Sequence, residues 1–343
     1  MAVVLAATLA VCGALAAPRP DDRTPLLRTL DSLFFAGRYD TLQTLFPALI
    51  HGAEARGDSA ALGRLVFHRG RVEITLGHQA LADQCFDRAI RLAEAARDTV
   101  GLLPALHFKA FVLRDRGDPD AAMVLFERER ELGALARVPG AEGSAIGNLA
   151  YRDLRRGKLD DAKRGYARAM ELYRRSGSAY AITGAGLSMG QLHRALGDID
   201  SSRYWYREAL RLARHHRFPM HELWALNNLG LMEMDTGNWE SAASHYEGAL
   251  AIGRRIGFDR GQALPLMNLS LVWSYLGEMD RAQRAIDECL EVCRRAGFKD
   301  LEVGTTTALA VLNLESGRNR RAAALFRRNV NREFVFNQLQ RNE

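Results

Sequence analysis

Small and aromatic residues recur along the chain in one phase of forty residues. Glycine stands at eight positions forty apart, which are Gly37, Gly77, Gly117, Gly157, Gly197, Gly237, Gly277 and Gly317. Seven of the eight repeats carry a small residue five positions after the glycine, and seven carry an aromatic residue nine positions after it. Seven also carry a small residue seven positions before it. Self-similarity at a fixed period is the signature of a repeat architecture.

Each forty-residue unit is expected to fold as a helical hairpin. The recurring glycine suits the end of the first helix, where the chain needs a backbone angle that glycine adopts without strain. The small residue and the aromatic residue after the glycine are four apart, so they share one face of the second helix. The small residue before the glycine would let that aromatic ring approach the first helix closely.

These positions resemble the tetratricopeptide repeat family in its longer, forty-residue bacterial form. The likeness is clearest in the sixth repeat, in Asn228-Leu229-Gly230, Gly237-Asn238-Trp239, Ala242, Tyr246 and Ala249. The resemblance implies an all-α fold, a right-handed α-solenoid of eight helix-turn-helix repeats over residues 23–336. Residues 1–17 would be a signal-peptide-like or anchor segment, 18–22 a linker and 337–343 a tail. Pro47 predicts a bend in the second helix of the first repeat.

The first seventeen residues contain no charged side chain and end in small residues, with Ala14-Leu15-Ala16 fitting a cleavage site. The run is short for a membrane span, and no basic residue precedes it. We expect export to the periplasm, the cell surface or the medium, with membrane contact only if this segment stays uncleaved. The alternative is a terminal helix of a cytoplasmic protein.

The charge and the cysteine content limit the classes of ligand that the protein is expected to bind. The net charge is +6, but basic and acidic residues are interleaved along the chain, which favours a solvated helical surface over nucleic-acid binding. Cys289 and Cys293 lie four apart with no second pair to complete a metal site, so we interpret them as buried small side chains. We expect no metal, no cofactor and no small-molecule substrate.

One motif imitates an enzyme. Gly186-Leu187-Ser188-Met189-Gly190 has the spacing of a hydrolase nucleophile elbow, which must join a strand to a helix. The repeat phase instead places Ser188 inside a first helix, so we assign no catalytic residue and expect no enzyme.

A ligand of such a solenoid would lie on the concave face lined by first helices. Nine residues before the turn glycine, repeats four to seven carry Asn148, Ser188, Asn228 and Asn268. In relatives that bind peptides, the resemblance implies, amides at this phase bond a peptide backbone, for which Asn offers both donor and acceptor. The alternative is that these amides bond neighbouring helices. The same face is predicted to hold Tyr151, Gln191, Arg194, Asn227, Arg64, His68, Arg71 and Arg114, together with Arg28, His107, Met267 and Tyr275.

Basic side chains at the front of this face predict an acidic ligand. The sequence therefore predicts a non-enzymatic scaffold that binds an extended peptide or protein segment in its concave groove. The alternative is the sensor or regulatory arm of a larger bacterial signalling or protease protein that continues beyond residue 343.

Overall fold

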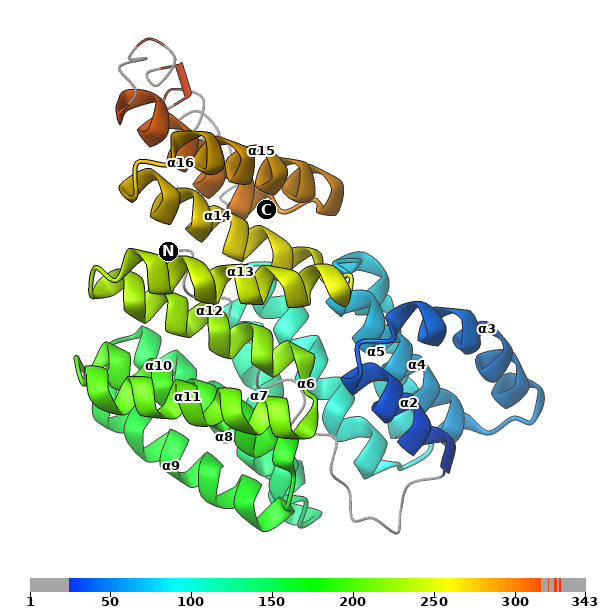
Figure 1. The fold of residues 1–343 in the computed structure, drawn as a ribbon. Coiled ribbons are helices and arrows are strands. Elements are labelled where there is room, and N and C mark those ends of the chain that lie inside the picture. The colour runs from blue at the N-terminus through cyan, green and yellow to red at the C-terminus, as the bar shows by residue number, and fades with distance from the viewer. Residues whose placement is uncertain (1–24, 316–319, 321–323, 326, 328–343) are drawn as a thin grey trace. The chain divides into compact units, whose positions relative to one another are not determined.

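A computed structural model describes residues 25–315 together with residues 320, 324–325 and 327 (Figure 1). In this part of the chain the secondary structure is entirely helical. Its fifteen helices are α2 (Pro25–Phe35), α3 (Tyr39–Ala55), α4 (Ser59–Thr75), α5 (Gln79–Ala95), α6 (Thr99–Asp115), α7 (Pro119–Leu135), α8 (Pro139–Arg155), α9 (Leu159–Ser176), α10 (Ala179–Ala195), α11 (Ile199–His216), α12 (Pro219–Asp235), α13 (Trp239–Arg255), α14 (Asp259–Tyr275), α15 (Met279–Ala296) and α16 (Lys299–Glu315).

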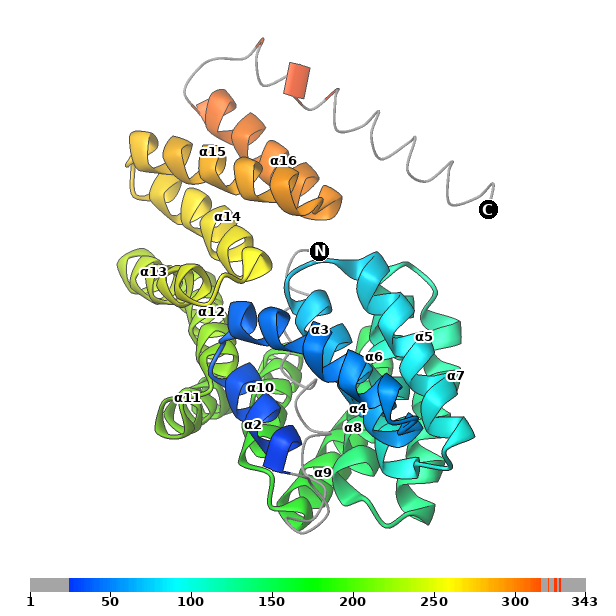
Figure 2. The same cartoon turned by 90° about the vertical axis from the view of Figure 1, so that its right-hand side faces the viewer.

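The chain divides into two compact units with the boundary between Ala225 and Leu226, inside α12. In the N-terminal unit, α2 to α11 form five hairpins and the start of α12 follows. In the C-terminal unit, the rest of α12 packs with α13, and α14, α15 and α16 follow. In each unit every helix lies antiparallel to the next one (Figures 1 and 2). We call the helix before a turn glycine the first helix of its repeat, and the helix after it the second.

The turn glycines lie where the forty-residue phase predicts. Seven of them fall within the described residues, and all seven have φ between 72° and 93°, a region that disfavours residues with a Cβ. The backbone N–H of the next residue bonds back across the turn, as from His78 to the Glu73 carbonyl at 2.8 Å. The eighth, Gly317, lies outside the described residues. The hairpin prediction is confirmed for the described repeats.

The second helices end as the sequence predicts, with one variation. Paired arginines stand in the last turns of α9, α13 and α15, where they complement the helix dipole. Glycine takes the left-handed position after α9 and α15, at Gly177 and Gly297. At the equivalent position after α5, α7 and α11 the chain has Arg97, Arg137 and Arg217, all with φ of 54° to 56°. A left-handed arginine is strained, so the turn geometry is imposed by the packing around it. α3 runs unbroken past Pro47.

Close packing inside each hairpin rests on the small residue of the first helix. A Cβ placed on Gly70 would lie 2.7 Å from the ring of Phe86, and one on Gly190 would lie 2.5 Å from the ring of Tyr206. Gly230 and Tyr246 repeat this arrangement at 2.8 Å. The aromatic rings are buried, with at most 2% of their surface exposed. The predicted approach of ring to backbone is therefore confirmed.

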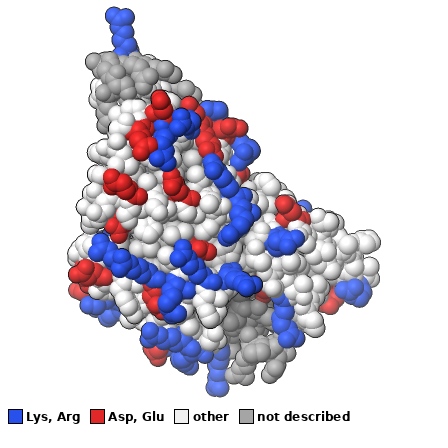
Figure 3. All heavy atoms as spheres, viewed as in Figure 1, with Lys and Arg blue, Asp and Glu red and all other residues white. Residues whose placement is uncertain are grey.

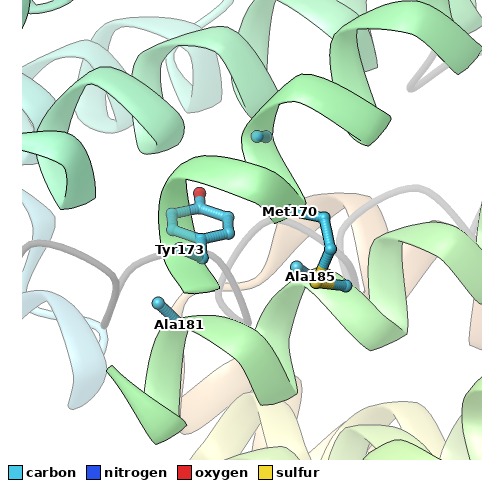
Figure 4. Close-up of a cluster of buried hydrophobic side chains, with 5 residues drawn as sticks. Met170, Tyr173, Ala181 and Ala185 are labelled. Carbon is cyan, nitrogen blue, oxygen red and sulfur yellow. The ribbon is translucent and has the colours of Figure 1, made fainter. Parts of the chain in front are cut away.

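Neighbouring repeats are joined by a second set of buried contacts. Met170 and Tyr173 on α9 pack against Ala181 and Ala185 on α10, the first helix of the next repeat (Figure 4). The short alanine side chains leave room for the aromatic ring and the thioether between the two helices. Each second helix therefore buries one face in its own hairpin and another against the following one.

Surface charges also link successive repeats. Arg88 bonds Glu54 at 2.6 Å and Arg128 bonds Glu94 at 2.7 Å, each pair thirty-four residues apart on consecutive second helices. Arg281 and Glu247 repeat this spacing in the C-terminal unit. Basic and acidic side chains are interleaved on the face shown in Figure 3. Exposed pairs of this kind contribute up to about 1 kcal/mol each.

No helix among the described residues is both long and apolar enough to cross a membrane. The apolar segment 1–17, the linker 18–22 and the tail 337–343 lie outside the described residues.

Two glycines of α10 test the role of the small position. We expect Gly190→Ala to destabilise the protein by about 1–3 kcal/mol, because the buried Tyr206 ring cannot move away from a new Cβ. Gly186→Ala is the control on the same helix. A Cβ there meets Ala209 at 3.5 Å, an ordinary contact, so the change should be neutral or stabilise by up to about 1 kcal/mol. Urea denaturation measures both, and equal effects would contradict this account.

Candidate functional site

The first helices of the N-terminal unit present one aligned row of side chains. Six residues before successive turn glycines the chain carries Asp31, Arg71, Phe111, Tyr151 and Gln191, which we call the first-helix row. Arg71 donates to Asp31 at 2.7 Å across forty residues. The Arg114 guanidinium lies 4.6 Å from the Phe111 ring and 5.9 Å from the Tyr151 ring. These contacts join α2 to α4 and α6 to α8.

The run of first helices in this unit curves back on itself. The Phe35 ring at the end of α2 lies 4.5 Å from the Tyr180 ring at the start of α10. It also lies 6.0 Å from Phe218, which immediately precedes α12. The first repeat therefore touches the fifth within this unit.

The first two residues of the row, Asp31 and Arg71, form a buried ion pair. Arg71 is 2% exposed, and its guanidinium lies 3.9 Å from the centre of the Phe34 ring as well as against Asp31. His68 Nδ1 stands 3.3 Å from Arg71 Nη1 and 3.7 Å from Asp31 Oδ1. The sequence places Arg71 and His68 on a basic binding surface, but in the structure both are buried and Asp31 offsets the charge of Arg71.

Arg64 is also paired with an acidic side chain. It makes two hydrogen bonds to Asp98, of 2.7 and 2.9 Å. Burial favours a raised pKa for Asp98, but the hydrogen bonds from Arg64 and from the Gly101 N–H outweigh it and hold the pKa below its usual range. Asp98 is thus both the N-cap of α6 and the counter-ion of Arg64. Arg28, the frontmost basic residue predicted here, is exposed.

His107 does not reach the binding face. It is fully buried on α6, and its Nδ1 lies 2.8 Å from Glu129 Oε2 on α7. Burial lowers the pKa of His107 to about 3, with a contribution from Arg114, and burial raises the pKa of Glu129 well above its usual range. Burial therefore favours the neutral form of both groups, in which the carboxylic acid donates to Nδ1. The expectation that His107 adds positive charge to the groove is corrected, because its ring points into the hairpin core.

Four predicted site residues on the first helices are partly exposed. They are Arg114 on α6, Tyr151 on α8, and Gln191 and Arg194 on α10, of which Tyr151 and Gln191 belong to the first-helix row. Tyr151 packs against the buried cluster of Ala150, Ala162, Tyr166 and Leu192. The Tyr151 ring is therefore held in place while part of it remains exposed. The four residues lie on the first helices of three consecutive repeats.

Asn148 and Ser188 make local hydrogen bonds within their own helices. The Asn148 amide donates to the Ser144 carbonyl at 2.9 Å, and the Ser188 hydroxyl lies 3.4 Å from the Gly184 carbonyl. Both side chains are less than 5% exposed. Their hydrogen bonds stabilise the helices, so the amide ladder stays a prediction.

The C-terminal unit carries the other predicted amides. Asn268 donates to Asn227 at 3.4 Å, and Asn227 and Asn228 are both 6% exposed. Met267 is buried, whereas Tyr275 is 67% exposed. The Tyr275 ring stacks on Trp239 at a centroid distance of 4.3 Å. Asn268 thus bonds the first helix of the preceding repeat, the arrangement that the alternative interpretation expected.

The remaining reactive side chains form no reaction centre in the described part of the chain. Ser188 lies inside α10, as the repeat phase predicts. Cys289 and Cys293 are buried with their sulfurs 4.0 Å apart, and Cys289 contacts the Thr305 hydroxyl at 3.1 Å. The described residues contain no group of three His, Cys, Asp or Glu side chains that could hold a metal ion.

Four important residues were missed by the sequence argument. Asp31 shares the forty-residue phase with Arg71, so their pairing could have been inferred from opposite charges at equivalent positions. Phe35, Tyr180 and Phe218 could not, because their contact depends on how tightly the repeats curve.

Comparison with known families agrees with the helical hairpins. Residues 221–294 match the tetratricopeptide repeat family. Residues 35–116 and 157–218 match the family described as anaphase-promoting complex subunit 5. No curated protein matches the chain as a relative.

Solved structures share the fold over most of the chain. A Rap protein complexed with Competence and Sporulation Factor is 15% identical, with a TM-score of 0.65 over 91% of this chain and 97% of that one. A signal transduction ATPase with a tetratricopeptide repeat sensor from Pyrococcus horikoshii is 15% identical, with a TM-score of 0.56 over 98% of this chain and 54% of that one. Aspartyl phosphate phosphatase F from Bacillus subtilis is 11% identical, with a TM-score of 0.51 over 92% and 96%. At these identities the likeness concerns the fold alone.

Because Glu129 is buried, we predict that the difference in stability between the wild type and Glu129→Gln depends on pH. In Glu129→Gln the amide N–H can still donate to His107, but the side chain no longer titrates. Between pH 4.5 and the raised pKa the folded protein keeps the Glu129 proton while the unfolded chain loses it, so the wild type loses stability as pH rises through this range. We expect the stability of the variant relative to the wild type to rise within this range by up to about 1.4 kcal/mol per pH unit.

Urea denaturation of both proteins at pH 5 and pH 7 measures this gain. Groups common to both, including the imidazole, largely cancel in the difference. A difference that stays constant between the two pH values would show that Glu129 is ionised in the folded protein.

Proposed function

We propose that this chain, a repeat protein of the tetratricopeptide type, binds an extended segment of a partner protein along the first-helix row of its N-terminal unit. The observation that carries the proposal is the partly exposed set Arg114, Tyr151, Gln191 and Arg194, on the first helices of three consecutive repeats. A held aromatic ring beside amide and guanidinium groups can bind the apolar and the polar parts of a peptide together.

The physical case rests on preorganisation. Tyr151 is fixed against the Leu192 cluster and Arg114 is stacked on Phe111, so a ligand does not have to order these side chains. Binding that immobilises few groups retains more of its contact energy. The Rap structure in complex with Competence and Sporulation Factor supports the proposal, since a chain of this fold there takes a second molecule.

The charge of the ligand belongs to the same proposal. Arg64 and Arg71 are offset by Asp98 and Asp31, so the basic front expected from the sequence is largely neutral. Arg114 and Arg194 lie on later first helices and would favour a ligand with an acidic residue beside Tyr151. This places the acidic end of the ligand at the third to fifth repeats.

We propose a binding role and no catalysis for this surface. A helix N-cap, a stacked guanidinium and a buried neutral His–Glu pair supply no nucleophile within reach of a base. A second candidate is a sensor or regulatory arm of a larger protein. It is supported by the signal transduction ATPase, of which a chain like this one makes up about half.

Export remains a separate proposal from the first seventeen residues. Fusing residues 1–30 to a reporter that is active only outside the cytoplasm tests it. Activity of the fusion supports a signal or anchor, and an inactive cytoplasmic fusion contradicts it.

Two tyrosines test the proposed surface. Peptides are selected on the full chain from a random twelve-residue library, and their affinities are measured by fluorescence anisotropy. We expect Tyr151→Ala to weaken the selected peptides at least tenfold, because the ring contributes buried aromatic contact. Tyr204→Ala is the matched control, since Tyr204 is 61% exposed on the second helix α11. Equal losses in both variants, or no loss in Tyr151→Ala, would place binding elsewhere.

A further inference from the structure

The first helix within the described residues, α2, packs over the front of the first-helix row. α2 has eleven residues, whereas the helices that follow have seventeen or eighteen. Its buried side chains are Leu27, Leu30, Asp31 and Phe34. Asp31 and Phe34 both contact Arg71, and Phe35 reaches across to Tyr180 and Phe218. α2 therefore spans from the second repeat to the fifth and sixth.

Beneath α2, the Arg71 guanidinium has fewer hydrogen-bond acceptors than donors. Nη1 donates to Asp31, but Nε and Nη2 are buried with no hydrogen-bond partner among the described residues. The guanidinium is surrounded by rings, with Phe67 and Phe108 within 6 Å in addition to Phe34 and Phe35. A buried cation with two unbonded donors is costly even when paired. The two donors are matched to a carboxylate, which accepts two parallel bonds from one guanidinium edge.

We propose that α2 is a built-in lid over a carboxylate site formed by Arg71 and His68. An acidic side chain of the bound segment then replaces Asp31 as the counter-ion of Arg71 and accepts from the Nε and Nη2 donors that Asp31 leaves unbonded. This inference rests on the proposed function, and it identifies the ligand group and the element that must move. The closed form is the one described above. When α2 swings away on the Gly37 turn, the Arg71 edge and the His68 ring become accessible at the front of the row.

The ends of α2 make such a movement feasible. Its C-terminal end meets α3 through the three residues Ala36, Gly37 and Arg38, with Gly37 at φ 72°. Lids are drawn from the least stable parts of a fold, and a short terminal helix buries less than the helices that follow it. A ligand that needs the open form binds with an affinity reduced by the open fraction. Any change that loosens α2 should therefore tighten binding.

The charges around the site favour an acidic ligand once Asp31 is removed. Arg71 and Arg114 are then the cations that face the row from α4 and α6. Arg64 remains paired with Asp98, and the neutral His107 adds no charge. The ligand class is thus a peptide with a carboxylate side chain.

The first experiment uses the full chain and needs no ligand. Hydrogen exchange of residues 25–35 is followed by mass spectrometry in the wild type, in Asp31→Asn and in Asp98→Asn. We expect exchange in α2 to quicken at least tenfold in Asp31→Asn, with α4 to α11 unchanged. Asp98→Asn is the matched control, because it frees Arg64 from an acid and adds the same charge without touching α2. Asparagine there can still cap α6.

The second experiment measures binding of a fluorescein-labelled deca-glutamate probe at constant salt. We expect Asp31→Asn to bind at least tenfold more tightly than the wild type, and Asp98→Asn to bind like the wild type. Adding Arg71→Gln to Asp31→Asn should remove the gain. If that double variant does not fold, His68→Gln in the same background should lower the gain by several fold.

Three results would overturn the lid. These are α2 exchange that matches the wild type in Asp31→Asn, an equal gain in Asp98→Asn, or a gain that survives both the Arg71 and the His68 changes. The exchange result does not depend on any peptide. If peptides bind through Tyr151 while α2 exchange is unchanged, the proposed function stands and the lid fails. If hydrogen exchange in α2 quickens in Asp31→Asn but no selected peptide depends on Tyr151, the proposed function is contradicted while the movement of α2 is not.

Discussion

The whole repeat depends on one close contact, the aromatic ring of a second helix against a position of the first helix that has little or no side chain. At Gly190 the Tyr206 ring occupies the space where a Cβ would stand, and Gly70 and Gly230 repeat the arrangement. This contact fixes the distance between the two helices, and the turn glycine fixes their connection. Because both recur at forty residues, one hairpin geometry is repeated along the chain, and the same face of every first helix turns to the same side. The first-helix row is a direct consequence.

Repetition of one geometry also explains why side chains far apart in sequence meet at regular spacings. Asp31 and Arg71 are forty residues apart and form an ion pair on adjacent first helices. Arg88 and Glu54 are thirty-four apart and join adjacent second helices. The two pairs differ in consequence, because the first is buried and the second is exposed. Removing one partner of a buried pair leaves a charge without compensation, whereas an exposed pair is replaced by water at little cost.

The sequence was sufficient for the hairpins and the turns. These follow from residue sizes and periods, which do not depend on neighbours in space. It was not sufficient for the electrostatics of the first helices. Arg71, His68 and Arg64 have the right phase for a basic groove, but Asp31 and Asp98 reach them from other repeats. His107 shares the region yet turns to Glu129, since a buried ring adopts the rotamer that provides a partner. The repeat phase fixes the position of a residue on its helix. Which residue its side chain bonds depends on the neighbouring helix and on the rotamer that the side chain adopts.

The distribution of buried charge along the row has a further consequence for how the repeats behave. At the position six residues before the turn glycine, the row begins with Asp31 and Arg71, passes through aromatic Phe111 and Tyr151 and ends at Gln191. The equivalent positions of the C-terminal unit are the aliphatic Leu231 and Leu271. Aliphatic packing tolerates small shifts, because dispersion contacts are many and non-directional. A buried ion pair tolerates few, because every separation of its members leaves an uncompensated charge. In the lid that we propose, the pair at the front would therefore favour two discrete positions of α2, closed on Arg71 or fully released, over a continuous range. A helix with two such positions would act as a switch, which the aliphatic positions of the C-terminal unit would not provide.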